Sequence, residues 1–111
     1  MKVRELRIGT RSVHVRVRVL REVTKRTVMS PTGPVPMLEV LVADETGTIV
    51  FTVWGDNTQR IKVGDVLDVK GARVKAFRGQ PRLTLGRTGT FEIIEDTEFP
   101  SLEQLTRMHR L

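Results

Sequence analysis

Two aromatic side chains, Trp54 and Phe77, stand beside residues that would suit them to binding. Trp54 ends a segment of alternating residue types, and Phe77 comes directly before Arg78, with Lys75 and Arg82 nearby. An exposed ring can stack on another flat aromatic group, while neighbouring cations attract an anion. A nucleotide offers both partners, a base face and a phosphate. These residues therefore predict a surface for an unpaired strand, because a duplex hides its base faces.

Alternation decides whether Trp54 is exposed. In the segment 48–54, Phe51 and Val53 share one parity, while Thr52 and Trp54 share the other. Successive strand residues point to opposite faces, and the Phe51 set makes the better core row. A lone Trp in a small domain is more often buried, but burying Trp54 would turn Phe51 outward. We therefore expect Trp54 on the outer face.

Phe77 is expected at the tip of a hairpin, where a side chain has few apolar neighbours. The other phenylalanines read better as core or as packing for the tail. They are Phe51, Phe91 and Phe99.

The elements that would position these rings are strands. Valine holds every odd position from 13 to 19, a period of two that predicts a half-buried strand. The expected strands are Val13–Leu20, Met37–Ala43, Thr48–Trp54, Val66–Val74 with a bend at Gly71, and Pro81–Leu85, with Phe91–Ile94 as its continuation or as a sixth strand.

The connections are predicted from turn and breaker residues. Three prolines make Thr24–Pro36 too broken for a central strand, so we expect a long loop there. The other expected connections are a tight turn at Asp44–Gly47, a helical bridge within Gly55–Val63, a hairpin tip at Phe77–Gln80, and a short amphipathic helix that follows Ser101, with Gln104 completing a capping box.

This order of elements predicts an all-β fold. Five strands with one helical bridge between the third and the fourth suit a five-stranded OB-fold Greek-key barrel, and an SH3-like barrel is the runner-up. We expect residues 1–96 to form the OB domain and residues 97–111 to form a tail with the short helix. That helix is expected to cap one end of the barrel, with recruitment of a protein partner as the alternative.

The charge of the chain is unevenly placed. The 111 residues carry 19 basic and 13 acidic side chains, a formal charge of +6, with arginine well ahead of lysine. Basic residues gather in 1–26 and again in 70–87, whereas the segment 92–103 is acidic without a base. A concentrated basic face attracts polyanions through counterion release.

Several classes of function have little to build on. The chain has no cysteine, and His14 and His109 lie far apart in the sequence, so we expect no enzyme, no metal site and no cofactor. Asp65 and Asp68 fit surface ion pairs better than an acid–base couple. No apolar run approaches the ~20 residues of a membrane span. The basic start lacks the apolar stretch of a signal peptide. We expect a cytoplasmic, nucleoid-associated monomer.

The sequence resembles a known family from about residue 3 to residue 94. That family comprises the single-OB single-stranded-DNA-binding proteins of crenarchaea and the OB subunit of the eukaryotic sensor-of-single-stranded-DNA complex. Each shared motif is short, and their order and spacing together are specific. The motifs are Glu5-Leu6-Arg7, Val17-Arg18-Val19-Leu20, Asp44-Glu45-Thr46-Gly47, Thr52-Val53-Trp54-Gly55, Gly64-Asp65-Val66, Ala76-Phe77-Arg78-Gly79 and Leu83-Thr84-Leu85.

The resemblance implies roles for individual residues. In that family three aromatic residues stack on bases, and Trp54 and Phe77 match the first and third of them. Arg73 stands at the second position, where an arginine could stack through its guanidinium or contact a phosphate. Arg26 matches a basic position that contacts DNA. Thr84 stands where the eukaryotic relatives have a further tyrosine.

The sequence thus predicts sequence-tolerant binding of single-stranded DNA, which would protect it in replication, recombination or repair. Proteins of those processes are the implied partners, and self-association through the C-terminal helix is a further option. The alternatives are an RNA-binding OB module and a scaffold subunit of a larger complex. The residues expected to contact the strand are Lys25, Arg26, Thr52, Trp54, Arg73, Lys75, Phe77, Arg78, Arg82 and Thr84.

Overall fold

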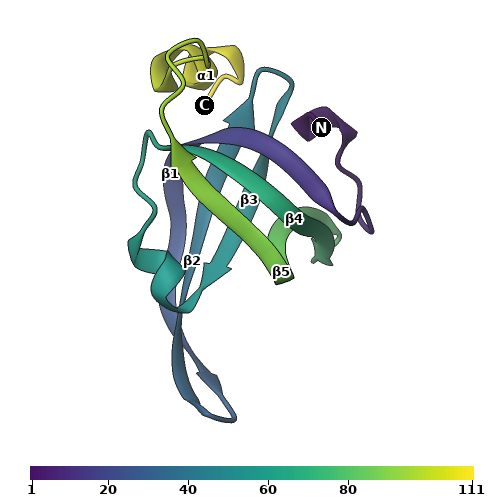
Figure 1. Cartoon of the computed structure of the whole chain (residues 1–111), viewed down its shortest axis with the longest axis vertical. Helices are drawn as coiled ribbons and strands as arrows, with labels where there is room; N and C mark the ends of the chain where they lie inside the picture. Colours follow the sequence, from purple (N-terminus) through teal and green to yellow (C-terminus); the bar gives the residue numbers. More distant parts are fainter.

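Five strands close into a barrel in the computed structural model, which describes residues 1–111 apart from the side chain of Arg87. The strands follow each other around the barrel in the order β1-β2-β3-β5-β4 (Figure 1). This confirms the predicted five-stranded barrel. The elements are η1 (Val3–Glu5), β1 (Val13–Ser30), β2 (Gly33–Asp44), β3 (Gly47–Trp54), η2 (Gly55–Gln59), β4 (Val66–Phe77), β5 (Gln80–Ile94) and α1 (Leu102–Met108).

The barrel interior is filled by the residues that alternation assigned to it. The odd-numbered valines of β1 from 13 to 19 are buried, and so are Phe51 and Val53 of β3. Phe51 meets the edge of Phe91 at right angles, with ring centroids 6.1 Å apart. Phe91 belongs to β5, so the segment 91–94 continues the fifth strand. Alternation of residue types therefore predicted the core correctly.

The segment Thr24–Pro36 is not a loop, and that expectation was wrong. The pairing of β1 with β2 continues to Ser30 and Gly33, so the two strands form a long hairpin arm. The arm projects beyond the barrel, at the end away from α1 (Figure 1). Its prolines are tolerated because Pro34 and Pro36 have the same parity, which lets both positions without an N–H face away from β1.

Strand β4 bends at Gly71, where it lies beside β5. Gly71 has a φ of +72°, and the pairing of β4 with β5 shifts between Lys70 and Ala72. A Cβ added at Gly71 would lie 3.2 Å from the Cα of Gly89, so the two backbones approach closely only because both residues are glycine. The predicted bend is confirmed, and residues 86–89 of β5 bulge out of the pairing with β4.

A short parallel contact closes the barrel. β3 and β5 share three register pairs, Val50 with Arg82, Phe51 with Leu83, and Thr52 with Thr84. The other neighbouring strands pair antiparallel over longer stretches. The closure therefore depends on the shortest of the five strand pairings.

Helix α1 covers one part of the outer surface. Ser101 accepts a hydrogen bond from the Gln104 backbone, and the Gln104 side chain accepts one from the Ser101 backbone, which confirms the predicted capping box. Leu105 is fully buried against Leu20, Leu41 and Ala43. The helix thus caps this end of the barrel, as favoured from the sequence. None of the described helices has the length and apolar character needed to cross a bilayer.

Candidate functional site

A hollow of about 270 Å³ lies on the outer face of the barrel, between the start of the arm and the β4–β5 hairpin. We call it the aromatic groove because it contains both rings singled out from the sequence. Its lining residues come from all five strands. They are Arg26, Met37, Thr52, Trp54, Lys75, Ala76, Phe77, Arg82 and Thr84.

Strand register assembles the groove from residues far apart in the sequence. Met37 of β2 pairs with Arg26 of β1 and with Trp54 of β3, which sets these three side chains in one row. Thr52 pairs with Thr84 in the neighbouring row. Because residues opposite each other in a sheet point to the same face, all of these side chains share the outer face.

Both rings are open to solvent. Trp54 is 45% exposed and Phe77 is 43% exposed, in a chain whose core aromatics Phe51 and Phe91 are buried. Phe77 forms the last pair of the β4–β5 hairpin with Gln80. The two residues between them, Arg78 and Gly79, both have positive φ, as a tight type I′ turn requires. This turn holds Phe77 at the hairpin tip that was predicted.

Arg82 and Glu39 support the ring of Phe77. The guanidinium carbon of Arg82 lies 4.1 Å from the ring centroid, and that of Arg78 lies 5.3 Å from it. Glu39 is buried and forms an ion pair with Arg82. Arg82 is therefore held between a carboxylate and an aromatic face. The ion pair with Glu39 balances the charge of Arg82, and the contact with the ring orients Phe77.

Glu39 was missed in the sequence analysis, although a signal was available. It lies on the same parity as Met37 and Leu41, in a strand whose other row is apolar up to Asp44 at its end. A carboxylate on the outer row, facing strands rich in arginine, predicts an ion pair across the sheet. Met37, the buried floor of the groove beside Trp54, was also missed.

Seven of the ten residues expected at the site line the aromatic groove, and three do not. Arg73 pairs with Thr84 and lines the next hollow along the outer face. Arg78 lies in the hairpin turn beside Phe77. Lys25 pairs with Leu38, so alternation puts it on the face of the arm opposite to Arg26.

The cations of the groove differ in how far they are engaged within the protein. Arg82 is paired with Glu39. Among the described side chains, no carboxylate lies within 4.0 Å of Arg26 or Lys75. These two cations border the rings and remain available to an external anion.

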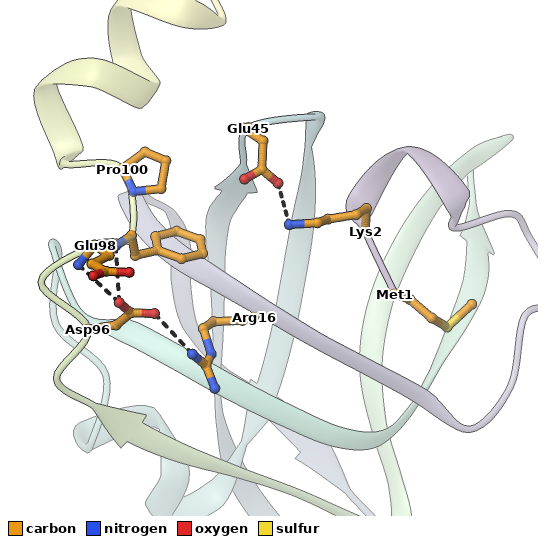
Figure 2. A pocket seen from close by; sticks show the side chains of 8 residues that line it. Met1, Lys2, Arg16, Glu45, Asp96, Glu98 and Pro100 are labelled. Atoms are coloured by element: carbon orange, nitrogen blue, oxygen red, sulfur yellow. Dashed lines mark hydrogen bonds and ion pairs between the residues drawn. The ribbon is translucent and has the colours of Figure 1, made fainter.

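A second hollow lies near the N-terminus and the segment before α1, and four of its charged side chains form two ion pairs (Figure 2). Lys2 Nζ is 2.6 Å from a carboxylate oxygen of Glu45, and this hydrogen bond raises the pKa of Lys2 above its ordinary value. Arg16 donates to Asp96 at 2.9 Å, and this bond lowers the pKa of the Asp96 carboxyl below its ordinary value. Internal pairing therefore engages both cationic side chains of this hollow, Lys2 and Arg16, and leaves neither of them free for an anionic ligand.

Within the described residues, no group of three or more histidine, aspartate or glutamate side chains is arranged to hold a metal ion. Asp68 instead meets His14 at 3.0 Å, with Arg16 and Lys70 within 4.0 Å. Asp68 therefore forms ion pairs, as expected from the sequence, whereas the Asp65 carboxylate accepts a hydrogen bond from the Lys62 backbone N–H.

Sequence comparison finds a family model that matches residues 6–93, described as the single-stranded DNA binding protein Ssb-like OB fold. A curated relative, the single-stranded DNA binding protein Ssb of Saccharolobus solfataricus, is 37% identical over 105 residues. The match covers 94% of this chain and 70% of that protein.

Solved structures match the same barrel. A hypothetical protein of Arabidopsis thaliana has a TM-score of 0.75 at 29% identity, covering 90% of this chain and 76% of that one. A replication factor A related protein of Methanobacterium thermoautotrophicum has a TM-score of 0.70 at 24% identity, covering 86% and 90%. The second likeness concerns the fold alone, and both support the OB architecture.

Proposed function

Because the chain belongs to the Ssb-like family of OB-fold single-stranded DNA-binding proteins, we propose that its aromatic groove is where a DNA strand binds. The observation that carries the proposal is the joint exposure of Trp54 and Phe77 on one hollow whose cations Arg26 and Lys75 have no carboxylate partner among the described residues. A base on each ring and phosphates on the two cations would fill this groove. No step of bond making or breaking is part of the function proposed.

Binding of this kind tolerates any base sequence. Each base has a flat face, and stacking on an aromatic ring contributes ~1–3 kcal/mol per base by alanine substitution. Apart from the cations, the polar side chains that line the groove are those of Thr52 and Thr84, and two hydroxyls are too few to read a sequence by hydrogen bonds. The proposed role is to cover exposed strands during replication, recombination or repair.

Arg82 acts differently from the other cations in this proposal. Its charge is already balanced by Glu39, and its guanidinium lies against the ring of Phe77. We infer that Arg82 fixes the orientation of the Phe77 ring on which a base stacks, whereas Arg26 and Lys75 bind phosphates. Thr84, small where the eukaryotic relatives have tyrosine, would leave room above Arg82.

The experiment is a fluorescence titration with oligo-dT, its RNA counterpart and a duplex, each at two salt concentrations. Trp54 is the only tryptophan of the chain, so the signal reports on the groove without a label. We expect strong quenching by dT that weakens with salt, a weaker response to RNA and little response to duplex.

Two outcomes would contradict the proposal. A preference for the RNA strand would keep the groove but move its substrate to RNA, since the 2′-OH is what distinguishes the two. An unchanged spectrum with every strand, from a folded sample, would remove the groove as the binding site and favour a scaffold role.

A further inference from the structure

The hollowed outer surface of the barrel continues beyond the aromatic groove. Lys75 and Ala76 line that groove and also line an adjoining hollow of about 410 Å³ on the outer side of β4. Arg73 and Arg11 line this adjoining hollow, and both also line a third hollow of about 360 Å³ beside the bend in β4. The surface beyond Lys75 therefore continues over two arginines from distant parts of the sequence.

The N-terminal segment is fixed to β4 at this place. The Gly9 backbone N–H donates to the Val74 carbonyl at 2.9 Å, and the Val74 N–H donates to the Thr10 carbonyl at 2.8 Å. The next residue is Arg11, and it is followed by Ser12 with a φ of 54° at the start of β1. Two backbone hydrogen bonds thus hold the backbone next to Arg11 against Val74, the neighbour of Arg73.

Neither arginine forms an ion pair with the described part of the chain. Among the described side chains, no carboxylate lies within 4.0 Å of Arg11 or Arg73. The described residues lining the two hollows include no acid, and they supply the hydroxyls of Thr10, Ser12 and Thr88. Two unpaired guanidinium groups with hydroxyl donors beside them form a surface suited to a phosphate.

We propose that Arg11 and Arg73 together form a phosphate subsite for the DNA strand as it leaves the aromatic groove past Lys75. Arg73 then serves here as a phosphate ligand instead of a stacking platform. This inference rests on the proposed function, because it takes the strand to be seated on Trp54 and Phe77.

The test is a series of Trp54 titrations with oligo-dT of increasing length, over the range of about 4 to 16 nucleotides that OB folds cover. We expect Arg11→Gln to bind the shortest strands that fill the groove as wild type does. On longer strands we expect it to bind more weakly, with the slope of log K against log salt reduced by about 0.7 for one lost phosphate contact.

Arg4→Gln is the matched control. Arg4 belongs to the same N-terminal segment, but its backbone N–H bonds to Thr46 at the β2–β3 turn, away from β4. The Arg4→Gln variant loses the same charge as Arg11→Gln, and we expect it to bind strands of every length as wild type does. Arg73→Lys separates the two roles of that residue, since lysine keeps a phosphate contact and loses a planar stacking group. We expect Arg73→Lys to retain the wild-type salt slope and Arg73→Gln to reduce it by about 0.7.

The outcomes separate this inference from the function on which it rests. If wild type binds and Arg11→Gln matches Arg4→Gln at every length, the phosphate subsite is wrong while the groove stands. If Arg73→Lys behaves as Arg73→Gln does, charge is not what Arg73 contributes, and the subsite is again wrong. If wild type fails to respond to any strand, the proposed function falls and the subsite falls with it.

Discussion

Among the described residues, arginines lie over the rings of three phenylalanines, Phe77, Phe91 and Phe99, and the surroundings of Phe99 and Phe77 differ. Arg18 lies 5.8 Å from the centroid of Phe99, and its guanidinium donates to the carbonyls of Pro100 and Gly64. Phe99 is partly buried there, packed with α1. Arg82 lies 4.1 Å from the centroid of Phe77, whose ring remains 43% exposed.

The regions around these pairs differ in the same way. Beside α1, aromatic and cationic groups find their partners within the chain. At the aromatic groove, Trp54, Arg26 and Lys75 share a face with the Phe77 pair and have no such partners among the described residues. Residue types alone therefore do not mark a surface that is free to bind a ligand. What marks it is the set of groups that folding leaves without a partner.

The largest expected effect falls on the α1 end. Leu105→Ala removes a fully buried side chain that packs on Leu20 and Leu41, so it should lower the free energy of unfolding by about 2–5 kcal/mol. Urea denaturation measures this, with the half-exposed Met108→Ala as the control. DNA affinity of the folded protein should not change. A large loss of affinity with little loss of stability would show that the α1 end also binds the strand.

The next effect falls on the groove. Trp54→Ala and Phe77→Ala should each weaken binding by ~1–3 kcal/mol on any base sequence, while stability changes little. Anisotropy of a labelled oligo-dT measures both variants, since the first removes the intrinsic fluorophore. Ile93→Ala is the control, because Ile93 is 44% exposed and lies outside the groove. Unchanged affinity in both groove variants would remove base stacking from the mechanism.

Charge placement gives a smaller and more discriminating effect. Arg26→Gln should reduce the salt slope by about 0.7, as expected for one phosphate contact. Arg16→Gln removes the same formal charge, but Arg16 is bonded to Asp96, so its slope should match wild type. An equal reduction of the salt slope in both variants would mean that the net charge of the protein, and not the position of each cation, determines the salt dependence.

Glu39→Gln sharpens the same comparison from the opposite direction. It releases Arg82 from its carboxylate partner and so makes the groove behave more like a surface with one extra free cation. The salt slope should steepen by about 0.7 if the freed Arg82 reaches a phosphate. A slope equal to that of wild type would mean that Phe77 alone holds Arg82 away from the strand.

The smallest effect concerns the Asp96 carboxyl. Its bond from Arg16 lowers its pKa in the folded protein below that of the unfolded chain. It therefore contributes stability that is complete above the unfolded-state pKa and is lost as the pH falls through the folded-state pKa. An NMR titration should find this pKa depressed, and Arg16→Gln should return it toward the ordinary value. A depressed pKa that persists in the variant would assign the shift to the backbone N–H groups of Glu98 and Phe99 instead.

The sequence predicted the barrel and the exposed rings because both depend on alternation. Because Phe51 and Val53 must face the core, Trp54 must point to the outer face of the barrel, and it does so in the structure. The arm was mistaken for a loop because prolines were weighed without their parity. Pro34 and Pro36 are harmless where their missing N–H faces away from the partner strand.

Partnering could not be predicted in the same way. Nine basic residues in 1–26 look alike in the sequence, yet Arg16 and Arg18 are engaged by Asp96 and by the carbonyl of Pro100, more than 70 positions away. Which cations remain free depends on contacts that only the folded chain makes. Arg11 lacked any local signal, since its place beside Arg73 follows from the bonding of the N-terminal segment to β4.

The parallel contact of β3 with β5 is the shortest strand pairing of the barrel, and it lies beneath the aromatic groove. Of its three residue pairs, Thr52 with Thr84 joins two groove residues, and Val50 with Arg82 includes one. A DNA strand bound in the groove would contact both β3 and β5, and it would therefore oppose the local separation of the two strands. Amide hydrogens along residues 50–52 and 82–84 should therefore exchange early in the free protein and slow more than other barrel amides when DNA is added.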